Sequence, residues 1–116
     1  MAQVIYEQDV IIFELDPAYE SLEVQALQAM GELLLEEIGR AQTPRIVLDM
    51  THTRFIDSMF IETVFRGWKR IQERHGAMAI CCANEMCAEV LKTTKLDEIW
   101  AICPSREEAI QVVRTD

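Results

Sequence analysis

The residues best placed for chemistry are an acid and a serine side by side, Asp57 and Ser58, followed by the apolar pair Met59 and Phe60. They stand directly before a helical apolar stripe, so the serine is expected at or beside a helix N-terminus. The backbone N–H groups there lack intrahelical acceptors, and with the helix dipole they favour negative charge by roughly 0.3–1 kcal/mol. From the residues alone two roles are open, a helix cap or a hydroxyl that accepts a phosphate.

The apolar pair after the serine indicates a surface for another protein. Because Met59 and Phe60 precede the stripe that begins at Ile61, at least one of them is expected to be exposed. An exposed apolar side chain beside a switch residue is typical of an interface. Asp57 is interpreted as a cap or a partner contact, since a kinase brings its own base, nucleotide and Mg²⁺.

Four cysteines, Cys81, Cys82, Cys87 and Cys103, raise the question of a disulfide or a metal. Cys81 and Cys82 lie in a run typical of a strand, where neighbouring side chains point to opposite faces, so they make a poor disulfide framework. Cys82 and Cys87 with His75 have irregular spacing, unlike the paired clusters of structural zinc. We therefore expect reduced, buried thiols, no metal and no cofactor.

Composition and motifs exclude several classes of function. The sequence has no glycine-rich phosphate loop, no HExxH motif and no serine in a Gly-x-Ser-x-Gly frame, so no catalytic residue is assigned and no enzyme is expected. Eleven basic against 20 acidic residues give a net charge of −9, which argues against binding nucleic acid or anionic membrane. The longest stretch without charge, His75–Asn84, is too short to span a bilayer, and the start of the chain has no signal-peptide pattern. A cytoplasmic location is expected.

Five short runs have the composition of strands. They are Val4–Tyr6, Val10–Leu15, Arg45–Met50, Ala77–Cys82 and Ile99–Ile102. The first two are separated only by Glu7-Gln8-Asp9 and are expected to pair as a hairpin, although the turn lacks an Asn-Gly signature. The apolar run Ile46–Met50 is expected at the centre of a sheet and the Val4 run at its edge.

Four amphipathic stretches lie between or after these runs. The first follows Asp16-Pro17, carries Leu22, Leu27, Met30, Leu34 and Ile38 on its apolar face and ends near Gly39. The second carries Ile61, Val64, Phe65, Trp68 and Ile71, with Trp68 expected in the core and Gly76 as the glycine that ends the helix. The third is capped by Asn84 and turns Met86, Val90 and Leu91 inward, and the fourth opens with the capping box Ser105–Glu108 and turns Ala109, Ile110 and Val113 inward.

The order ββαβαβαβα predicts one α/β domain over residues 1–116, with a mixed sheet of four or five strands and about four helices packed on it. This order and five blocks within it resemble the STAS domain, which sulfate-transporter tails share with bacterial anti-sigma factor antagonists. The blocks are Ile46–Met50, Phe55–Ser58, His75–Cys81, Leu91–Trp100 and Ser105–Ile110.

The resemblance implies specific roles for the residues before the second helix. Ser58 would be the phosphoacceptor of a partner kinase, and Asp57, Ser58, Met59 and Phe60 would contact the partner. The family commonly has a small residue and then a glycine after this serine, where this chain has Met59 and Phe60.

The function that the resemblance implies is a cytoplasmic regulatory module similar to an anti-sigma factor antagonist. Its unphosphorylated form would bind a serine/threonine kinase-type anti-sigma factor, and phosphorylation of Ser58 would release it. One alternative is an accessory subunit of a membrane transporter without phosphorylation. Another is a subunit of a stress-signalling scaffold, which the Met59-Phe60 pair favours. Each implies a protein partner and neither nucleic acid nor insertion into a membrane.

Overall fold

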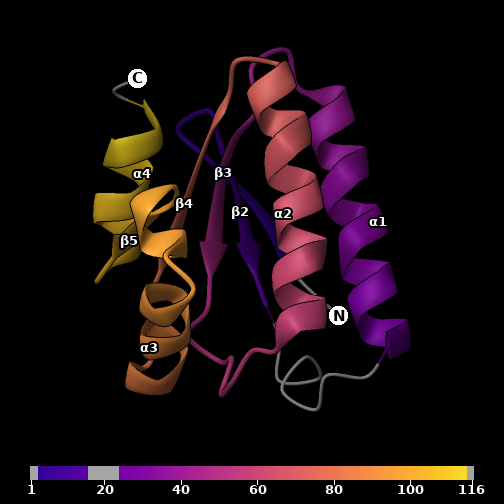
Figure 1. Ribbon diagram of the computed structural model, residues 1–116. Coiled ribbons are helices and arrows are strands. Elements are labelled where there is room, and N and C mark those ends of the chain that lie inside the picture. The colour runs from indigo at the N-terminus through magenta and orange to yellow at the C-terminus, as the bar shows by residue number, and fades with distance from the viewer. Residues whose placement is uncertain (1–2, 16–23, 115–116) are drawn as a thin grey trace.

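Within residues 3–15 and 24–114, which the structure describes, five strands and four α-helices alternate in the predicted order in this computed structural model (Figure 1). The elements are β1 (Gln3–Glu7), β2 (Val10–Glu14), α1 (Val24–Arg40), β3 (Arg45–Asp49), α2 (Ser58–Glu73), β4 (Ala77–Cys81), α3 (Glu85–Thr93), a short 3₁₀ helix (Leu96–Glu98), β5 (Ala101–Cys103) and α4 (Arg106–Arg114). The predicted helix start at Asp16-Pro17 and the predicted core position Leu22 lie outside the described residues.

The strands form one sheet in the order β1-β2-β3-β4-β5. β1 and β2 are antiparallel and the other neighbours are parallel, so the sheet is mixed, with β3 central and β1 at an edge as predicted. The predicted hairpin is confirmed. Its two-residue turn, Gln8-Asp9, has φ values of 53° and 67°, the left-handed backbone of a type I′ turn. The turn forms without glycine, and the side chain of Asp9 is one of those that tolerate this conformation.

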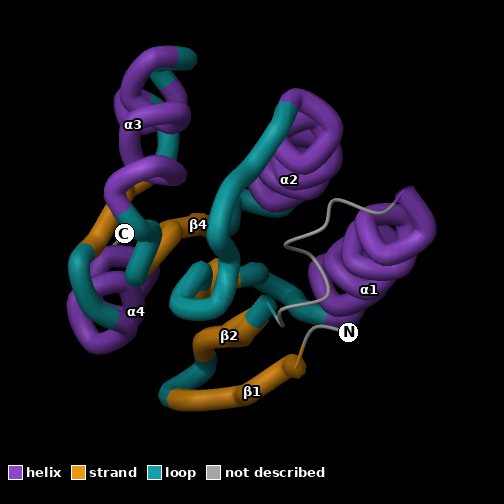
Figure 2. Tube along the Cα trace, turned by 90° about the horizontal axis from the view of Figure 1, so that it is seen from below, coloured by secondary structure: helices purple, strands orange, loops and turns teal. Residues whose placement is uncertain are grey.

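The helices cover the two faces of the sheet unequally (Figure 2). Each parallel connection moves one strand further in the same direction, and right-handed crossovers therefore place α1, α2 and α3 on one face. That face holds the larger apolar core, which includes Phe13, Leu34, Leu48, Phe60 and Trp100. α4 covers the other face, where Val47 and Ala79 meet Ala109 and Val113. The consecutive residues Val47 and Leu48 thus belong to different cores, as the alternation of a strand requires.

The two tryptophans are placed differently from the prediction. Trp68, expected in the core, is only half-buried and packs at the flank of the apolar stripe, with its ring centroid 5.3 Å from that of Phe65. Trp100 is 1% exposed and is the tryptophan that fills the core. The stripe of α2 is therefore narrower than predicted, and its fully buried apolar side chains are Phe60, Val64 and Ile71.

The last strand lies further along the chain than predicted. Residues Leu96–Glu98 form a 3₁₀ turn after Lys95, whose φ is 63°, and the Trp100 N–H donates to the Leu96 carbonyl. Because of this turn, Ile99 and Trp100 precede the strand, and β5 covers only Ala101–Cys103. Ile99 is 45% exposed. The prediction for Met86 is also wrong, because α3 begins at Glu85 and its helical period turns Cys87 and Leu91 inward, leaving Met86 62% exposed.

The glycine after α2 has a different role from the one predicted. The left-handed residue is His75, with φ of 58°, and its N–H and that of Gly76 return to the carbonyls of Gln72 and Ile71. This is a Schellman motif with histidine in the position usually held by glycine. A Cβ atom on Gly76 would overlap the carbonyl oxygen of Pro44, so glycine is required there by close backbone approach.

Candidate functional site

The loop between β3 and α2 carries the predicted site and is held in place from α3. The side-chain amide of Asn84 donates to the carbonyls of Thr53 (3.3 Å) and Arg54 (2.8 Å), while its oxygen accepts from the N–H of Cys87 (2.8 Å). Asn84 is thus both the predicted cap of α3 and a clamp on this loop. Ile56 is 6% exposed and anchors the loop in the core.

Helix α2 begins as predicted at the Asp57-Ser58 pair. Asp57 is the N-cap in an extended backbone conformation, and its carboxylate accepts from the N–H of Phe60 at 3.0 Å. Ser58 is the first residue of the helix and is exposed. The cap role therefore belongs to Asp57. The Ser58 hydroxyl lies at the positive end of the helix dipole, in a first turn that contains no acidic residue.

The apolar pair after Ser58 divides between surface and core. Met59 is 43% exposed and confirms the expectation that at least one of the two reaches the surface. Phe60, predicted to contact a partner, is 2% exposed and packs within the core. Phe55, two residues before the cap, is 39% exposed and flanks Ser58 on the other side in sequence.

A groove between α1 and α2 was not predicted. It has a volume of about 410 Å³ and is lined by Leu27, Gln28, Gly31, Glu32, Leu35, Met59, Glu62, Thr63 and Arg66. Met59 lines this groove and also follows Ser58 directly in sequence. The groove therefore lies next to the start of α2, within reach of a partner that contacts Met59. The small residue Gly31 facing Thr63 marks the groove, but sequence spacing alone cannot pair positions on two separate helices.

A partly buried ion-pair network at the ends of β2 and β3 was also missed. Arg106, the first residue of α4, donates to Asp49 at 3.1 Å from Nε and 2.8 Å from Nη2, and to Glu14 at 2.5 Å. Asp49 also accepts from the N–H and the hydroxyl of Thr51, at 2.9 and 2.5 Å. The only sequence signal was that Glu14 and Asp49 each end an apolar strand.

These contacts set the electrostatics of the network. Burial alone would raise the pKa of Asp49, but the hydrogen bonds from Thr51 and Arg106 outweigh burial and hold that pKa below its ordinary value. The hydrogen bond to Asp49 in turn raises the pKa of Arg106. Both groups therefore stay charged at neutral pH, and the network fixes the start of α4 against the sheet.

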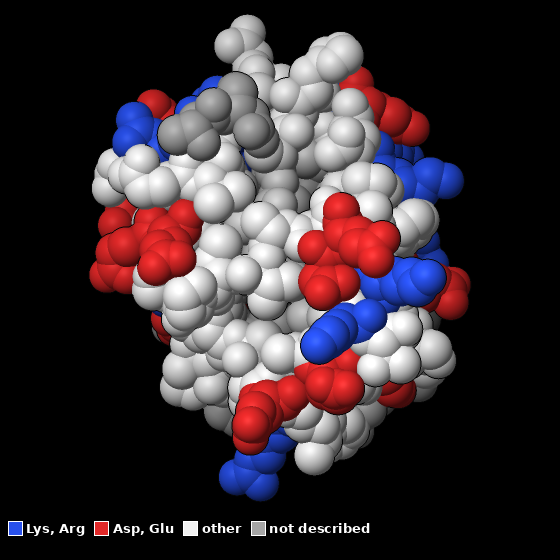
Figure 3. Space-filling view, turned by 60° about the vertical axis from the view of Figure 1, so that its left-hand side comes forward, with Lys and Arg blue, Asp and Glu red and all other residues white. Residues whose placement is uncertain are grey.

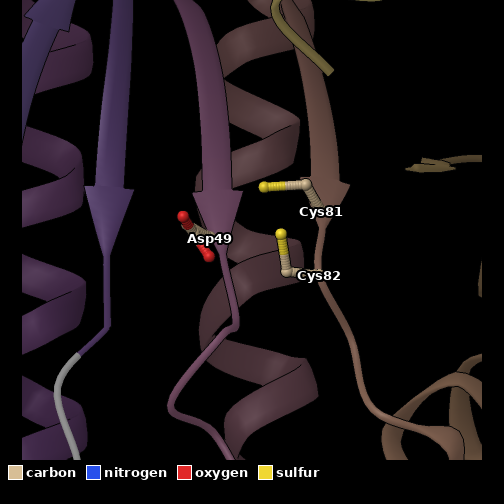
Figure 4. A group of neighbouring side chains, drawn as sticks. All are labelled: Asp49, Cys81 and Cys82. Atoms are coloured by element: carbon tan, nitrogen blue, oxygen red, sulfur yellow. The ribbon is translucent and has the colours of Figure 1, made fainter. Parts of the chain in front are cut away.

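The cysteines are free thiols, three of them buried. Burial raises the pKa of Cys81, Cys87 and Cys103, so these thiols are held in the neutral form. The expectation that Cys81 and Cys82 point to opposite faces is wrong. β4 ends at Cys81, and Cys82 has a left-handed backbone with φ of 63°, which brings the two sulfur atoms close together beside Asp49 (Figure 4).

Charge on the face that carries α3 and α4 is mixed. Acidic and basic side chains are interspersed over it, and uncharged surface separates the acidic groups (Figure 3). Among the described residues, no helix combines the length and the apolar character needed to cross a bilayer.

The fold places the chain among the small α/β domains with a mixed sheet, and comparison with known proteins identifies the family. The family profile of the STAS domain matches residues 6–109. This chain is a member of the STAS domain family, as the resemblance implied. None of the curated proteins compared with the chain matches it.

Solved structures give the same result. An anti-sigma factor antagonist (STAS) domain protein from Planctomyces limnophilus is 29% identical, with a TM-score of 0.88 and 97% of each chain covered. The anti-sigma factor antagonist SpoIIAA in its unphosphorylated form is 17% identical, with a TM-score of 0.81 over 100% of this chain and 98% of that one. The phosphorylated form of SpoIIAA from Bacillus is 18% identical, with a TM-score of 0.69 over 97% and 99%. The two SpoIIAA structures support the fold alone.

Proposed function

We propose that this chain is a regulatory protein-binding module whose association with a kinase-type anti-sigma factor is switched by phosphorylation of Ser58. The observation that carries the proposal is the exposed hydroxyl of Ser58 as the first residue of α2, beside the exposed Met59 and behind a cap supplied by Asp57. Because Asp57 already caps the helix, Ser58 is free to be modified without loss of the cap.

The reaction needs nothing from this chain except the hydroxyl group. In the kinase, a base takes the Ser58 proton, the hydroxyl oxygen attacks the γ-phosphorus of ATP, and ADP leaves as the phosphoester forms. The phosphate adds a charge of about −1.5 to −2 at pH 7. The helix dipole and the free N–H groups of the first turn favour that charge, so the domain stays folded after modification.

The same charge acts differently on a complex. A partner that covers Ser58 and Met59 would take the phosphate out of water, and a charge left unpaired at an interface costs about 2 kcal/mol or more. Folding and binding therefore respond in opposite ways to one modification, which is the property of a switch. SpoIIAA, whose fold is similar, has been solved in an unphosphorylated and a phosphorylated form, and modification of this chain is proposed by analogy.

The test begins with the unmodified chain as bait in native cytoplasm, with bound proteins identified by mass spectrometry. The captured kinase is then titrated calorimetrically with the parent, Ser58→Asp and Ser58→Ala. Ser58→Asp should lose about 2 kcal/mol or more of binding free energy. Ser58→Ala should bind like the parent and should not be labelled by ATP.

A matched control is Ser105→Asp, which adds the same charge at the start of α4, where aspartate remains a good cap. It should bind like the parent. If Ser58→Asp also binds like the parent and no phosphate from ATP is found on Ser58, the switch is excluded. A role as a transporter subunit or scaffold subunit would then replace it.

A further inference from the structure

The end of strand β4 brings together two thiols that the regular alternation of a strand would separate. Cys81 is the last residue of β4, and its side chain lies on the α4 side of the sheet with the core residues Ala79 and Cys103. Cys82 has a φ of 63°, a conformation that costs a residue other than glycine roughly 1–2 kcal/mol. The consequence is that both sulfur atoms and a carboxylate oxygen of Asp49 lie within 4.8 Å of one another (Figure 4).

The carboxylate in this group is already fully engaged. One oxygen of Asp49 accepts two hydrogen bonds from Thr51 and the other accepts two from Arg106. A carboxylate has about four acceptor positions, and these four bonds occupy them. Asp49 is thus a structural anchor, and the donors that remain for a ligand are the two sulfurs.

The position of the pair fits an ion better than a disulfide. Adjacent Cα atoms are about 3.8 Å apart, below the roughly 4.4–6.8 Å that an unstrained disulfide spans. Two sulfurs that share one ion, each at about 2.3 Å, are separated by about 3.8 Å in a tetrahedral arrangement and about 4.6 Å in a linear one. The separation of the Cys81 and Cys82 sulfurs, within 4.8 Å, accommodates this range.

We propose that Cys81 and Cys82 together bind one thiophilic monovalent cation, Cu⁺. Thiolate sulfur is the ligand that selects Cu⁺, and this ion accepts two or three sulfur ligands, whereas structural zinc takes four. Cys103 is the register partner of Cys81 on β5 and belongs to the same buried cluster, but it is not part of the group within 4.8 Å. The irregular spacing that argued against zinc in the sequence does not bear on two adjacent thiols.

The charges around the pair are mixed, because Arg106 is paired there with Asp49 and Glu14. Binding displaces both thiol protons, so Cu⁺ and two thiolates form a complex with one net negative charge. Burial and the carboxylate of Asp49 raise the pKa of Cys81, while the guanidinium of Arg106 at the N-terminal end of α4 lowers it by less. The bond to sulfur must therefore displace a proton that the Cys81 thiol otherwise keeps. Because Cys82 is only partly buried, an ion has a route from solvent.

The test uses the reduced full chain under anaerobic conditions, with Cu⁺ supplied as its coloured bicinchoninate complex. The parent should withdraw one Cu⁺ per chain, seen as loss of the colour and as one bound copper by native mass spectrometry. Cys82→Ser should bind at least about 100-fold more weakly, because even loss of an outer-shell group costs a site 10–100-fold. This variant is preferred because Cys82 is half-buried, and a thermal melt verifies its folding.

Cys87→Ser is the matched control, since Cys87 is a buried cysteine on α3 whose sulfur donates to the Thr53 carbonyl, outside the pair. It should bind Cu⁺ like the parent. The proposal is overturned if the parent withdraws no Cu⁺, or if the two serine variants bind equally. It is also overturned if Zn²⁺ displaces Cu⁺ from the pair, or if the untreated chain has lost two hydrogen atoms to a Cys81–Cys82 disulfide. None of these outcomes depends on Ser58.

Discussion

Helices α2 and α4 begin with the same kind of cap, but the residue after the cap is exposed in α2 and ion-paired in α4. Asp57 accepts from the N–H of Phe60, and Ser105 accepts from the N–H of Glu108, in each case three residues along. The residue after the first cap, Ser58, is exposed, whereas the residue after the second, Arg106, is bound to Glu14 and Asp49. The cap is therefore not what distinguishes a site for modification from a structural anchor. The contacts of the next side chain make the difference.

Both helix starts lie at one end of the domain because of the sheet topology. The parallel strands β2, β3, β4 and β5 run in one direction, and each is followed by a helix that returns (Figure 1). Every helix N-terminus thus collects at the carboxyl ends of the strands, where ligands of open α/β sheets bind. In this chain, that end of the domain holds both the ion-pair network of Arg106 at the start of α4 and the exposed Ser58 at the start of α2.

The largest effect on stability is expected from removing the ion pairs of Arg106 at the start of α4. Arg106→Met keeps the length of the side chain but leaves Asp49, whose side chain is 4% exposed, without its counter-charge. Breaking a buried ion pair by removing one partner costs about 3–5 kcal/mol, and the partial exposure of Arg106 places this case near the lower end. Urea unfolding followed by circular dichroism measures the loss.

The control for that variant is Arg66→Met on α2. Arg66 faces Glu62 at 3.6 Å with both side chains more than half exposed, so its loss should cost less than about 1 kcal/mol. Equal destabilisation by the two substitutions would show that the anchor at α4 contributes no more than a surface pair.

The ion-pair network at the start of α4 should also make the stability of the fold fall at acid pH. The pKa of Asp49 is lower in the folded chain than in the unfolded chain, so its contribution is complete above the unfolded value of about 4 and is lost as pH falls through the folded value. Stability should therefore decrease below about pH 4. Asp49→Asn should be less stable at pH 7 but should lose less on acidification, which denaturant titrations at both pH values would reveal.

A smaller effect is expected from removing the caps themselves. Asp57→Ala and Ser105→Ala each leave one first-turn N–H without its side-chain acceptor, at a cost of about 1 kcal/mol. If the two helix starts differ only in the residue after the cap, the two losses in thermal melts should both fall within the range of about 0.5–2 kcal/mol. A much larger loss for Ser105→Ala would mean that the cap also holds Arg106 in its network.

The smallest effect on folding is expected from a substitution of the exposed Ser58 at the start of α2. Ser58→Asp places a carboxylate in the first turn of α2, where the helix dipole favours it by about 0.3–1 kcal/mol. The variant should melt at or slightly above the temperature of the parent. A clear drop in melting temperature would show that Ser58 is packed in a way its exposure does not reveal, and would remove the contrast with α4.

The fold was largely predictable because it depends on periodicity. The continuous apolar run Ile46–Met50 indicated that β3 is central, and the Val4 run was expected at the edge. The cap residues Asp57, Asn84 and Ser105 marked three helix starts. The errors at Trp68 and Met86 were errors in the width and phase of a helical stripe, and the displaced last strand came from a backbone feature with little sequence signal. A left-handed Lys95 followed by a 3₁₀ turn displaced the last strand, and this moved Trp100 from strand to core.

The candidate site was predictable only for residues that are neighbours in the sequence. Ser58 follows its own cap, so its place at the start of α2 could be inferred from neighbours in sequence. The network of Arg106 with Glu14 joins residues far apart in the chain, and no spacing rule relates them. The contact of the Cys81 and Cys82 sulfurs depends on one positive φ angle in a non-glycine residue, which composition does not indicate.

The close approach of Gly76 to Pro44 has a consequence for which sequences this fold accepts. In a saturation library selected for folded protein, position 76 should return glycine almost alone, because any Cβ would strike a backbone oxygen that cannot move without displacing β3. Position 75 has the left-handed backbone, yet it should accept asparagine and glycine as well as the present histidine. Variation should thus be narrowest where α2 ends and widest at the exposed positions where it begins.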